Sequence, residues 1–454
     1  MHMSQPNLVF LFSDQQRWDT VSGRTGGRSI TPNLDALAST GVRFDRAFSC
    51  QPVCGPARAC LQTGQYATEV GCHTNGRALP KDATTIAHHL GRAGYQRAYV
   101  GKWHLASNDG QEGEDFRTRP VPPDRRGGWD DYWIASDVLE FTSHSYDGHM
   151  FDGDGNRREF PEGRYRVDAT TDFALEFLRE KRDPDRPFAL MVSWIEPHHQ
   201  NDHDRFEGPH GSEDRFADIP LPTDLAEADA QGDYPRNWAD YLGCCASLDE
   251  NVGRLRQTLD DLGIAEETLI LYTSDHGCHF QTRNAEYKRS CHDASLHIPM
   301  IVSGPDFTGG RVCEELVSLL DVPPTLLKAA GVTPPESMAG RALQQLVDGD
   351  VDQWRDEVFV QISESQIGRA IRTPRWTYSV KAEDYERTFH DQPPSAEVYV
   401  EDYLYDNHQD PAQLHNRVID PSLAEIRDEL RARLLRRIEQ AENATPEIRP
   451  HPGF

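Results

Sequence analysis

Apolar and polar positions alternate along this chain in blocks that predict a layered α/β fold. Continuous apolar runs without polar interruption predict strands that are buried on both faces of a parallel sheet. Such runs occupy residues 8–12, 96–100, 187–194, 268–273 and 298–303. Segments with helical spacing lie between and after them, at residues 32–40, 84–94, 168–182, 241–262 and 323–330. This alternation predicts a doubly wound, mostly parallel sheet flanked by helices.

The pattern changes towards the C-terminus. Residues 358–362 and 376–380 are typical of antiparallel strands, and residues 424–441 form a strongly charged helical segment. We therefore predict an α/β domain over residues 1–350 and a small α+β subdomain over residues 351–454. Residues 106–165 are rich in Gly, Asp, Arg and aromatic residues with weak periodicity, which predicts an insertion over one end of the sheet.

Composition narrows the classes of partner. The formal net charge of -27 argues against nucleic acid and anionic membranes as partners. No apolar run reaches the ~18–20 residues of a membrane span, and the N-terminus lacks the pattern of a secretory signal. The odd number of cysteines, 9, has no framework spacing and suits a reducing compartment. We expect a cytoplasmic protein without a membrane partner, and a homo-oligomer is compatible with the sequence.

A segment around Cys54 carries the strongest chemical signal. Cys54 and Pro56 open a predicted short helix that Gly64 ends, and Arg58 follows four residues after the cysteine. A helix N-terminus attracts anions through its unpaired N–H groups, and an arginine adds a rigid donor for oxyanions. Taken alone, these residues also fit a buried structural cysteine.

Polar residues follow the predicted strands at their carboxyl ends. In an open parallel sheet these ends share one edge, where ligands bind. Any one of these residues alone fits a solvated or capping role, but acids, bases and cations from four strands at one edge indicate a site. The residues are Asp14, Lys102, His104, His198, Asp275 and His276.

The chain resembles the sulfatase family over residues 7–441. The resemblance rests on Cys54-x-Pro-x-Arg58 with Leu61-Gln62-Thr63-Gly64 behind it. It includes Thr31-Pro32-Asn33-Leu34-Asp35, Gly101-Lys102-Trp103-His104, Pro197-His198, Thr273-Ser274-Asp275-His276-Gly277, Lys288 ahead of His297-Ile298-Pro299-Met300, Leu404-Tyr405-Asp406 and Asp410-Pro411.

The resemblance implies a sulfuric ester hydrolase in which Cys54 is converted to formylglycine by a formylglycine-generating enzyme. One divalent metal would be held by Asp14, Gln15, Asp275, His276 and the modified Cys54. Arg58 and Lys102 would hold and polarise the formylglycine, and His104 would assist elimination of sulfate. His198 and Lys288 would bind sulfate, and one of them would support or protonate the leaving oxygen. A small sulfated molecule, with a sugar favoured, is the expected substrate.

Three positions depart from the commonest family pattern. Ala57 replaces a serine in the signature, Gln15 replaces an aspartate, and His276 replaces an asparagine. Ca²⁺ remains the favoured ion, but a histidine ligand shifts preference towards Mn²⁺ or Zn²⁺. Relatives with Asp-Gln and Asp-His pairs include phosphonate monoester hydrolases and some sugar sulfatases. Because sulfate and phosphate esters need similar metal and cation contacts, a phosphonate monoester or phosphodiester hydrolase is the alternative. A non-catalytic metal-binding or anion-binding protein with an unmodified Cys54 is a third reading.

Several other residues are candidates near the site. Substrate-lining or structural roles are favoured over catalytic ones for His73, His199, Asp202, His203, His279 and His292. His297 has no assigned role, and Cys244 and Cys245 are expected to pack. One group in the insertion could stack on and hydrogen-bond a sugar ring: Trp129, Asp130, Asp131, Tyr132 and Trp133. A packing role is equally supported for the aromatic residues of this group.

Overall fold

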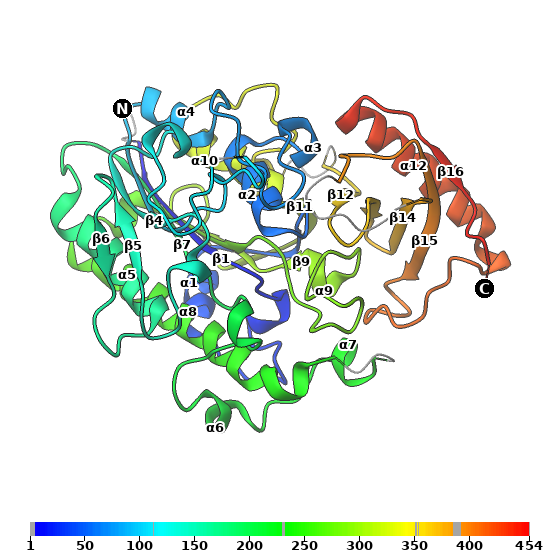
Figure 1. Cartoon of the computed structure of the whole chain (residues 1–454), viewed down its shortest axis with the longest axis horizontal. Coiled ribbons are helices and arrows are strands. Elements are labelled where there is room, and N and C mark those ends of the chain that lie inside the picture. The colour runs from blue at the N-terminus through cyan, green and yellow to red at the C-terminus, as the bar shows by residue number, and fades with distance from the viewer. Residues whose placement is uncertain are drawn as a thin grey trace.

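A large mixed sheet forms the centre of the molecule (Figure 1). The computed structural model describes residues 5–111, 113–228, 232–349, 352, 354–384 and 392–453. The 11-stranded sheet has the order β11-β2-β10-β8-β1-β7-β3-β4-β5-β6, and β9 pairs with β2. Its strands are β1 (Asn7–Ser13), β2 (Val42–Phe48), β3 (Gln96–Lys102), β4 (Tyr132–Ser136), β5 (His149–Asp152), β6 (Arg157–Glu159), β7 (Phe188–Ser193), β8 (Thr268–Ser274), β9 (His297–Ile298), β10 (Met300–Ser303) and β11 (Arg311–Ser318).

The middle of this sheet is parallel. β1 pairs in parallel with β7 and β8, and β3 pairs in parallel with β7 and β4. Of these strands, β1, β3, β7 and β8 correspond to the predicted apolar runs, because a strand covered by helices on both sides has no solvent-facing positions. Their carboxyl ends therefore meet at one edge of the sheet, as predicted from the sequence.

Helices cover both faces. Successive residues of β1 point to opposite faces of the sheet, so Leu8 and Phe10 pack on one face and Val9 and Leu11 on the other. One face packs against α2 (Cys54–Thr63), α4 (Ile86–Arg92) and α10 (Val322–Ala329). The other face packs against α1 (Pro32–Thr40), α5 (Arg166–Glu176) and α8 (Tyr234–Asp261). The predicted doubly wound α/β architecture is confirmed.

The prediction of an insertion over residues 106–165 is wrong in part. β4 lies inside this range but is a parallel strand of the main sheet beside β3, and β5 and β6 extend the sheet beyond it. Aromatic packing accounts for the position of β4 beside β3, because Trp129 and Trp133 are buried and pack on Tyr99 of β3. Their proposed sugar-stacking role is wrong, and the packing alternative is confirmed.

A second sheet of five strands follows, in the order β12-β13-β14-β15-β16. The strands are β12 (Val358–Ile362), β13 (Gly368–Arg372), β14 (Trp376–Ala382), β15 (Val398–Asp406) and β16 (Glu447–Arg449), and α12 (Ala424–Glu442) packs against them. The remaining short helices are α3 (Ala67–Val70), α6 (Ser212–Phe216), α7 (Thr223–Ala226), α9 (Asp293–Leu296) and α11 (Gln344–Val347). The boundary predicted between residues 350 and 351 lies outside the described residues and stays a prediction.

Within the part of the chain that the structure describes, no helix combines the length and apolar character that crossing a membrane requires.

Candidate active site

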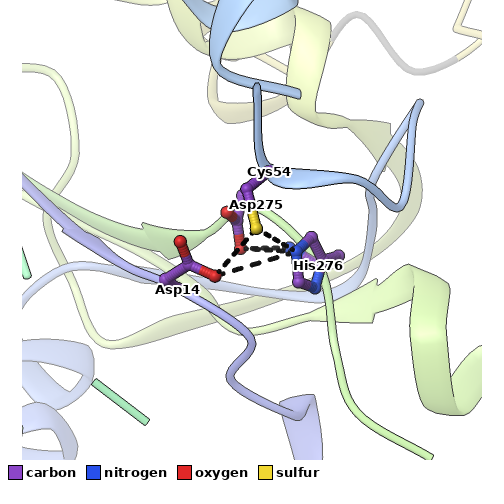
Figure 2. A group of neighbouring side chains, drawn as sticks. All are labelled: Asp14, Cys54, Asp275 and His276. Atoms are coloured by element: carbon purple, nitrogen blue, oxygen red, sulfur yellow. Dashed lines mark hydrogen bonds and ion pairs between the residues drawn. The ribbon is translucent and has the colours of Figure 1, made fainter. Parts of the chain in front are cut away.

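The ends of two strands meet the side chain of Cys54, which stands at a helix N-terminus (Figure 2). Asp14 follows β1, Asp275 and His276 follow β8, and Cys54 is the first residue of α2. The Cys54 Sγ lies 3.3 Å from Asp14 Oδ1 and 3.3 Å from His276 Nε2. One ligand atom from each of these four buried residues lies within 4.8 Å of the other three, so the group could hold a metal ion.

The two carboxylates have different environments. Burial raises the pKa of Asp14, but Lys102, His198 and Arg58 outweigh this effect and hold it well below its ordinary value. Burial and the neighbouring Asp14 raise the pKa of Asp275 to about 6. Among the described residues, Asp275 Oδ2 has no hydrogen-bond partner. A buried, orphaned carboxylate oxygen beside a second carboxylate fits a divalent cation.

The remaining predicted ligands are oriented by backbone contacts. His276 Nδ1 lies 3.0 Å from the Gly277 carbonyl, so donation from Nδ1–H leaves Nε2 free for an ion. Gln15 adopts a positive φ of 74°, and its N–H donates to Asp275 Oδ1 at 3.0 Å. This turn places Gln15 Oε1 3.4 Å from Lys288 Nζ, on the same side as Cys54.

Cations and imidazoles line the other side of Cys54. Lys288 Nζ donates to Cys54 Sγ at 2.8 Å and lies 3.2 Å from His198 Nε2. The Nδ1 of His198 lies 2.6 Å from the His199 carbonyl, which leaves Nε2 facing Lys288. Burial raises the pKa of the Cys54 thiol, but Lys288 and Lys102 hold it well below its ordinary value. The sulfur therefore occupies a position that favours negative charge.

Arg58 and Lys102 are buried against Asp14. Arg58 Nη2 donates to Asp14 Oδ2 at 3.0 Å, and Lys102 Nζ lies 2.9 Å from the same oxygen. Arg58 Nη1 also donates to the Lys102 carbonyl at 2.9 Å and to Ser193 Oγ at 2.7 Å. These contacts tie the signature helix to the ends of β3 and β7.

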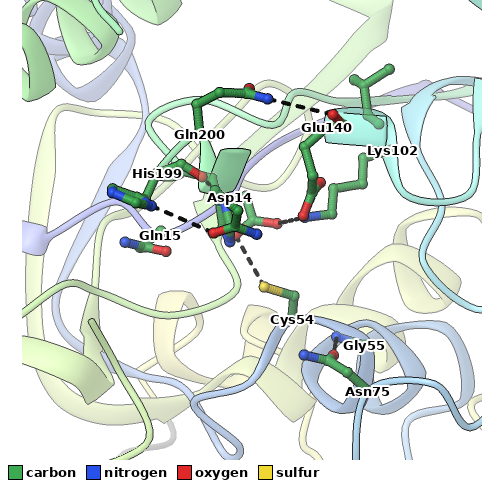
Figure 3. A network of polar contacts seen from close by, with 12 residues as sticks. Asp14, Gln15, Cys54, Gly55, Asn75, Lys102, Glu140, His199 and Gln200 are labelled. Carbon is green, nitrogen blue, oxygen red and sulfur yellow. Dashed lines mark hydrogen bonds and ion pairs between the residues drawn. The ribbon is translucent and has the colours of Figure 1, made fainter. Parts of the chain in front are cut away.

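Glu140 is a site residue that the sequence did not reveal (Figure 3). Its Oε2 lies 3.4 Å from Lys102 Nζ, and although burial raises its pKa, Lys102 and His198 lower it to about 2. Glu140 falls in the weakly periodic range 106–165, where it follows no predicted strand and no motif marks it. Lys102 thus bridges Asp14 and a second buried carboxylate.

His104 completes the set. It adopts a positive φ of 58°, its N–H donates to the Asp137 carbonyl at 2.6 Å, and its imidazole helps to lower the pKa of the neighbouring Cys54 thiol. Every residue predicted for the site is therefore in one cluster, joined by the contacts described here.

The additional histidines have other surroundings. The ring nitrogens of several of them contact carbonyl or hydroxyl groups in the core, which indicates structural roles: His73 with Gln392, His279 with Lys288, His292 with Tyr405 and His297 with Asp45. His199 stacks on Tyr287, and Asp202 and His203 lie on the exposed loop beyond it.

Comparisons with known proteins cover most of the chain. The family model described as Sulfatase matches residues 6–332, and that described as N-sulphoglucosamine sulphohydrolase, C-terminal, matches residues 285–440. The uncharacterized sulfatase YidJ of Escherichia coli is 28% identical over 95% of this chain and 87% of its own length.

Two solved structures show the same fold. A protein solved in complex with its substrate D-glucosamine-2-N,6-O-disulfate has a TM-score of 0.76 and 23% identity, covering 98% of this chain and 99% of its own. The phosphonate monoester hydrolase of Agrobacterium radiobacter has a TM-score of 0.71 and 23% identity, covering 96% of each chain.

Proposed function

The chain belongs to the sulfatase family of sulfuric ester hydrolases, and on that premise we propose that it releases sulfate from a small sulfated sugar through a formylglycine made from Cys54. The observation that carries this proposal is the position of the Cys54 Sγ. It lies between the carboxylate and imidazole of Asp14 and His276 on one side and the ammonium of Lys288 on the other. A hydrated formylglycine there would supply one hydroxyl as nucleophile and a second whose deprotonation expels sulfate.

The metal would be held by Asp14, Gln15, Asp275 and His276. Carboxylate and amide oxygens suit Ca²⁺, and the single imidazole makes Mn²⁺ or Zn²⁺ the alternatives. Such an ion would supply Lewis acidity towards a sulfate oxygen and the side chain at position 54. Two observations support this assignment: Asp275 Oδ2 accepts no hydrogen bond in the described residues and has Arg58 Nη2 3.7 Å away, and donation from Nδ1–H leaves His276 Nε2 unprotonated.

The protein's own residues divide the remaining work. Lys288 and His198, 3.2 Å apart, would bind the sulfate group and donate a proton to the departing alcohol oxygen. Arg58 and Lys102 would keep Asp14 ionised and oriented, because both contact its Oδ2. His104 would take the proton from the second hydroxyl when sulfate leaves.

A sulfated sugar is the favoured substrate class. One structural neighbour was solved with D-glucosamine-2-N,6-O-disulfate as its substrate. Among the residues described, the surroundings of Cys54 offer several cations that would offset the charge of a sulfate group, although the whole chain has a net charge of -27. Local cations therefore overcome the global field that would repel an anionic substrate.

Parallel kinetics test the proposal. Protein co-expressed with a formylglycine-generating enzyme is assayed with a nitrophenyl sulfate, a phenylphosphonate monoester and a panel of sulfated sugars. We expect sulfatase activity to exceed phosphonate hydrolysis. Kinetics are needed because both ester classes require similar metal and cation contacts. A rate on the phosphonate monoester more than about a hundredfold above the rate on the sulfate ester would instead support the phosphonate hydrolase.

Intact-protein mass spectrometry tests the modification. Conversion of Cys54 removes about 18 Da. A chain that stays unconverted in this host and inactive on all these esters would support the third reading, a non-catalytic metal-binding or anion-binding protein.

A further inference from the structure

A second group of potential metal ligands lies outside the site described above. His144 follows β4, and Asp202 and His203 lie on the loop that follows His198 after β7. The three side chains are partly exposed and border or adjoin an open pocket of about 450 Å³ that also contains Tyr146, Glu207 and His210. Ions from solution can therefore reach them.

The geometry of the group suits one small cation. One ligand atom from each of His144, Asp202 and His203 lies within 4.8 Å of the other two. His144 Nε2 lies 2.9 Å from Asp202 Oδ2, and the rings of His144 and His203 are stacked with centroids 4.5 Å apart and planes 9° apart. Ligands at the zinc distances of ~2.0–2.1 Å stand about 3.3 Å from one another in a tetrahedron, so the contact between His144 and Asp202 must open by a few tenths of an ångström. Because the two rings are stacked with nearly parallel planes, the exposed His203 side chain must also rotate so that its ring nitrogen faces the same ion as that of His144.

Each histidine is already held by a carboxylate through its other nitrogen. His144 Nδ1 lies 3.2 Å from Asp147 Oδ1, and His203 Nδ1 lies 2.7 Å from Glu207 Oε1. Glu207 is in turn fixed by Ser145 Oγ at 2.6 Å and Arg205 Nε at 3.1 Å. A carboxylate on the far nitrogen fixes the ring and raises the basicity of the nitrogen that binds a metal, which is the usual second layer of a zinc site.

The charge of the pocket favours a cation. Its lining carries the carboxylates of Asp147, Glu207, Glu213, Asp214 and Asp240 against the guanidinium of Arg205. Burial and the neighbouring Glu213 raise the pKa of Asp240, which shows that negative charge is crowded there. A second sulfate group would be repelled by such a lining, whereas a divalent cation is attracted to it.

We propose that His144, Asp202 and His203 bind a divalent transition-metal ion of the Zn²⁺ type, with the fourth coordination position open to solvent. Two imidazoles with one carboxylate and an open position match the ligand types that zinc accepts. The ion would join the segment after β4 to the loop after His198.

This junction is connected to the site around Cys54. Gln200 Nε2 donates to Asp202 Oδ1 at 2.7 Å and lies 3.4 Å from the carbonyl of Glu140, whose side chain contacts Lys102 (Figure 3). An ion at Asp202 would therefore fix the loop that carries His198 and His199 against the segment that carries Glu140. The binding itself does not depend on the proposed sulfatase mechanism.

The proposal is tested by measuring zinc stoichiometry in two variants, each altered in one of the two metal sites. Full-length protein is stripped with chelator, dialysed against buffered Zn²⁺ alone and measured by elemental mass spectrometry. His203→Gln should bind one equivalent fewer than the parent chain. Asp275→Asn, which alters the first site, should retain the equivalent that His203→Gln loses. His210→Gln is the matched control, because His210 lines the same pocket and stacks on Tyr146 without belonging to the ligand group.

A second readout locates the ion. Zn²⁺ should slow hydrogen exchange in residues 139–147 and 199–207 of the parent chain and of His210→Gln, but not of His203→Gln. Circular dichroism and melting temperature confirm that each variant is folded. Equal zinc stoichiometry in folded parent and His203→Gln proteins, or an equal loss in His210→Gln, would overturn the proposal.

Discussion

At the scale of single residues, position 54 is defined by what surrounds it. Carboxylates and an imidazole face it from the ends of β1 and β8, and Lys288 and His198 face it from two loops. Such an arrangement separates the groups that hold a cation from the groups that hold an anion. The reacting atom lies between these two sets of groups. Because the site is buried, electrostatic interactions with that atom are stronger there than in water.

Replacing Lys288 by alanine should impair catalysis far more than stability. Its ammonium donates to the Cys54 Sγ at 2.8 Å, so we expect kcat/KM for a nitrophenyl sulfate to fall by about 10²–10³. Lys288→Arg should restore little of this activity, because the planar guanidinium group of arginine does not reproduce the compact ammonium group of lysine. Lys328→Ala, on the exposed side of α10, is the control. A loss below tenfold in Lys288→Ala would contradict the role proposed for this lysine.

Buried neutral histidines predict acid lability. Burial lowers the pKa of His279 to about 3 and that of His297 to about 4, from 6.5. As the pH falls below 6.5, these histidines take up protons in the unfolded chain before they do so in the folded protein. Their contribution to the free energy of unfolding is therefore complete above pH 6.5 and decreases as the pH falls towards the folded-state pKa values. Each histidine should contribute about 1.4 kcal/mol per pH unit over this range.

Urea denaturation between pH 7 and 5, with chelator in every sample, measures this slope. The double variant His279→Gln, His297→Gln should lose less stability on acidification than the parent chain, by up to about 4 kcal/mol at pH 5. Parallel curves for the two proteins would show that other groups control acid unfolding.

At the scale of elements, local pattern predicted what is buried on both faces. β1, β3, β7, β8 and β10 were all predicted, because runs such as 8–12 and 268–273 have no polar interruption. β2 and β11 were missed because neither is a continuous apolar run. In β2, Val42 and Phe44 alternate with Arg43 and Asp45, and in β11 charged residues interrupt the first half. β2 lies between β11 and β10 and also pairs with β9, so nonlocal pairing defines both strands.

The same reasoning explains which site residues could be predicted. Those at the carboxyl ends of predicted strands, such as Asp14 and Asp275, were found because the parallel topology brings these ends together. Lys288 was found by resemblance alone. Glu140 and His144 lie after β4, a strand that the sequence did not reveal, so no rule about strand ends could reach them.

Gly101 tests the junction of β3 and β7. It adopts a φ of 113°, and a Cβ there would lie 2.0 Å from the Ser193 carbonyl oxygen of the paired strand. Gly101→Ala should therefore destabilise the protein by about 3 kcal/mol or more and displace the neighbouring Lys102. Gly94→Ala is the matched control, with a φ of 91° but no atom within 4 Å of the added Cβ. It should cost only about 1 kcal/mol, measured by urea denaturation. Equal losses would mean that backbone conformation, and not the contact with β7, requires glycine.

At the scale of the whole molecule, the second sheet takes part in building the site. Glu364 lies between β12 and β13 and is buried. Its carboxylate accepts from the Asn75 N–H at 2.6 Å and pairs with Arg289, the residue after Lys288. Asn75 Oδ1 in turn accepts from the N–H of Gly55, next to Cys54. One carboxylate from the second sheet thus contacts both segments that present the residues facing the substrate position.

Glu364→Gln tests whether this contact positions the catalytic groups. The amide keeps an acceptor for Asn75 but removes the charge that fixes Arg289, so Lys288 and Cys54 should lose their relative alignment. We expect kcat on a nitrophenyl sulfate to fall by about tenfold or more with KM little changed, because substrate contacts remain while the reacting geometry is displaced. Glu383→Gln, which removes an exposed partner of Arg449 on the same sheet, should leave both constants at the parent values.

If Glu364→Gln lowered the melting temperature without changing kcat, the second sheet would stabilise the catalytic domain without orienting its site. Because Arg289 would then be buried beside Glu286 alone among the carboxylates described around it, the stability loss by itself is expected and does not decide the question; the change in kcat does.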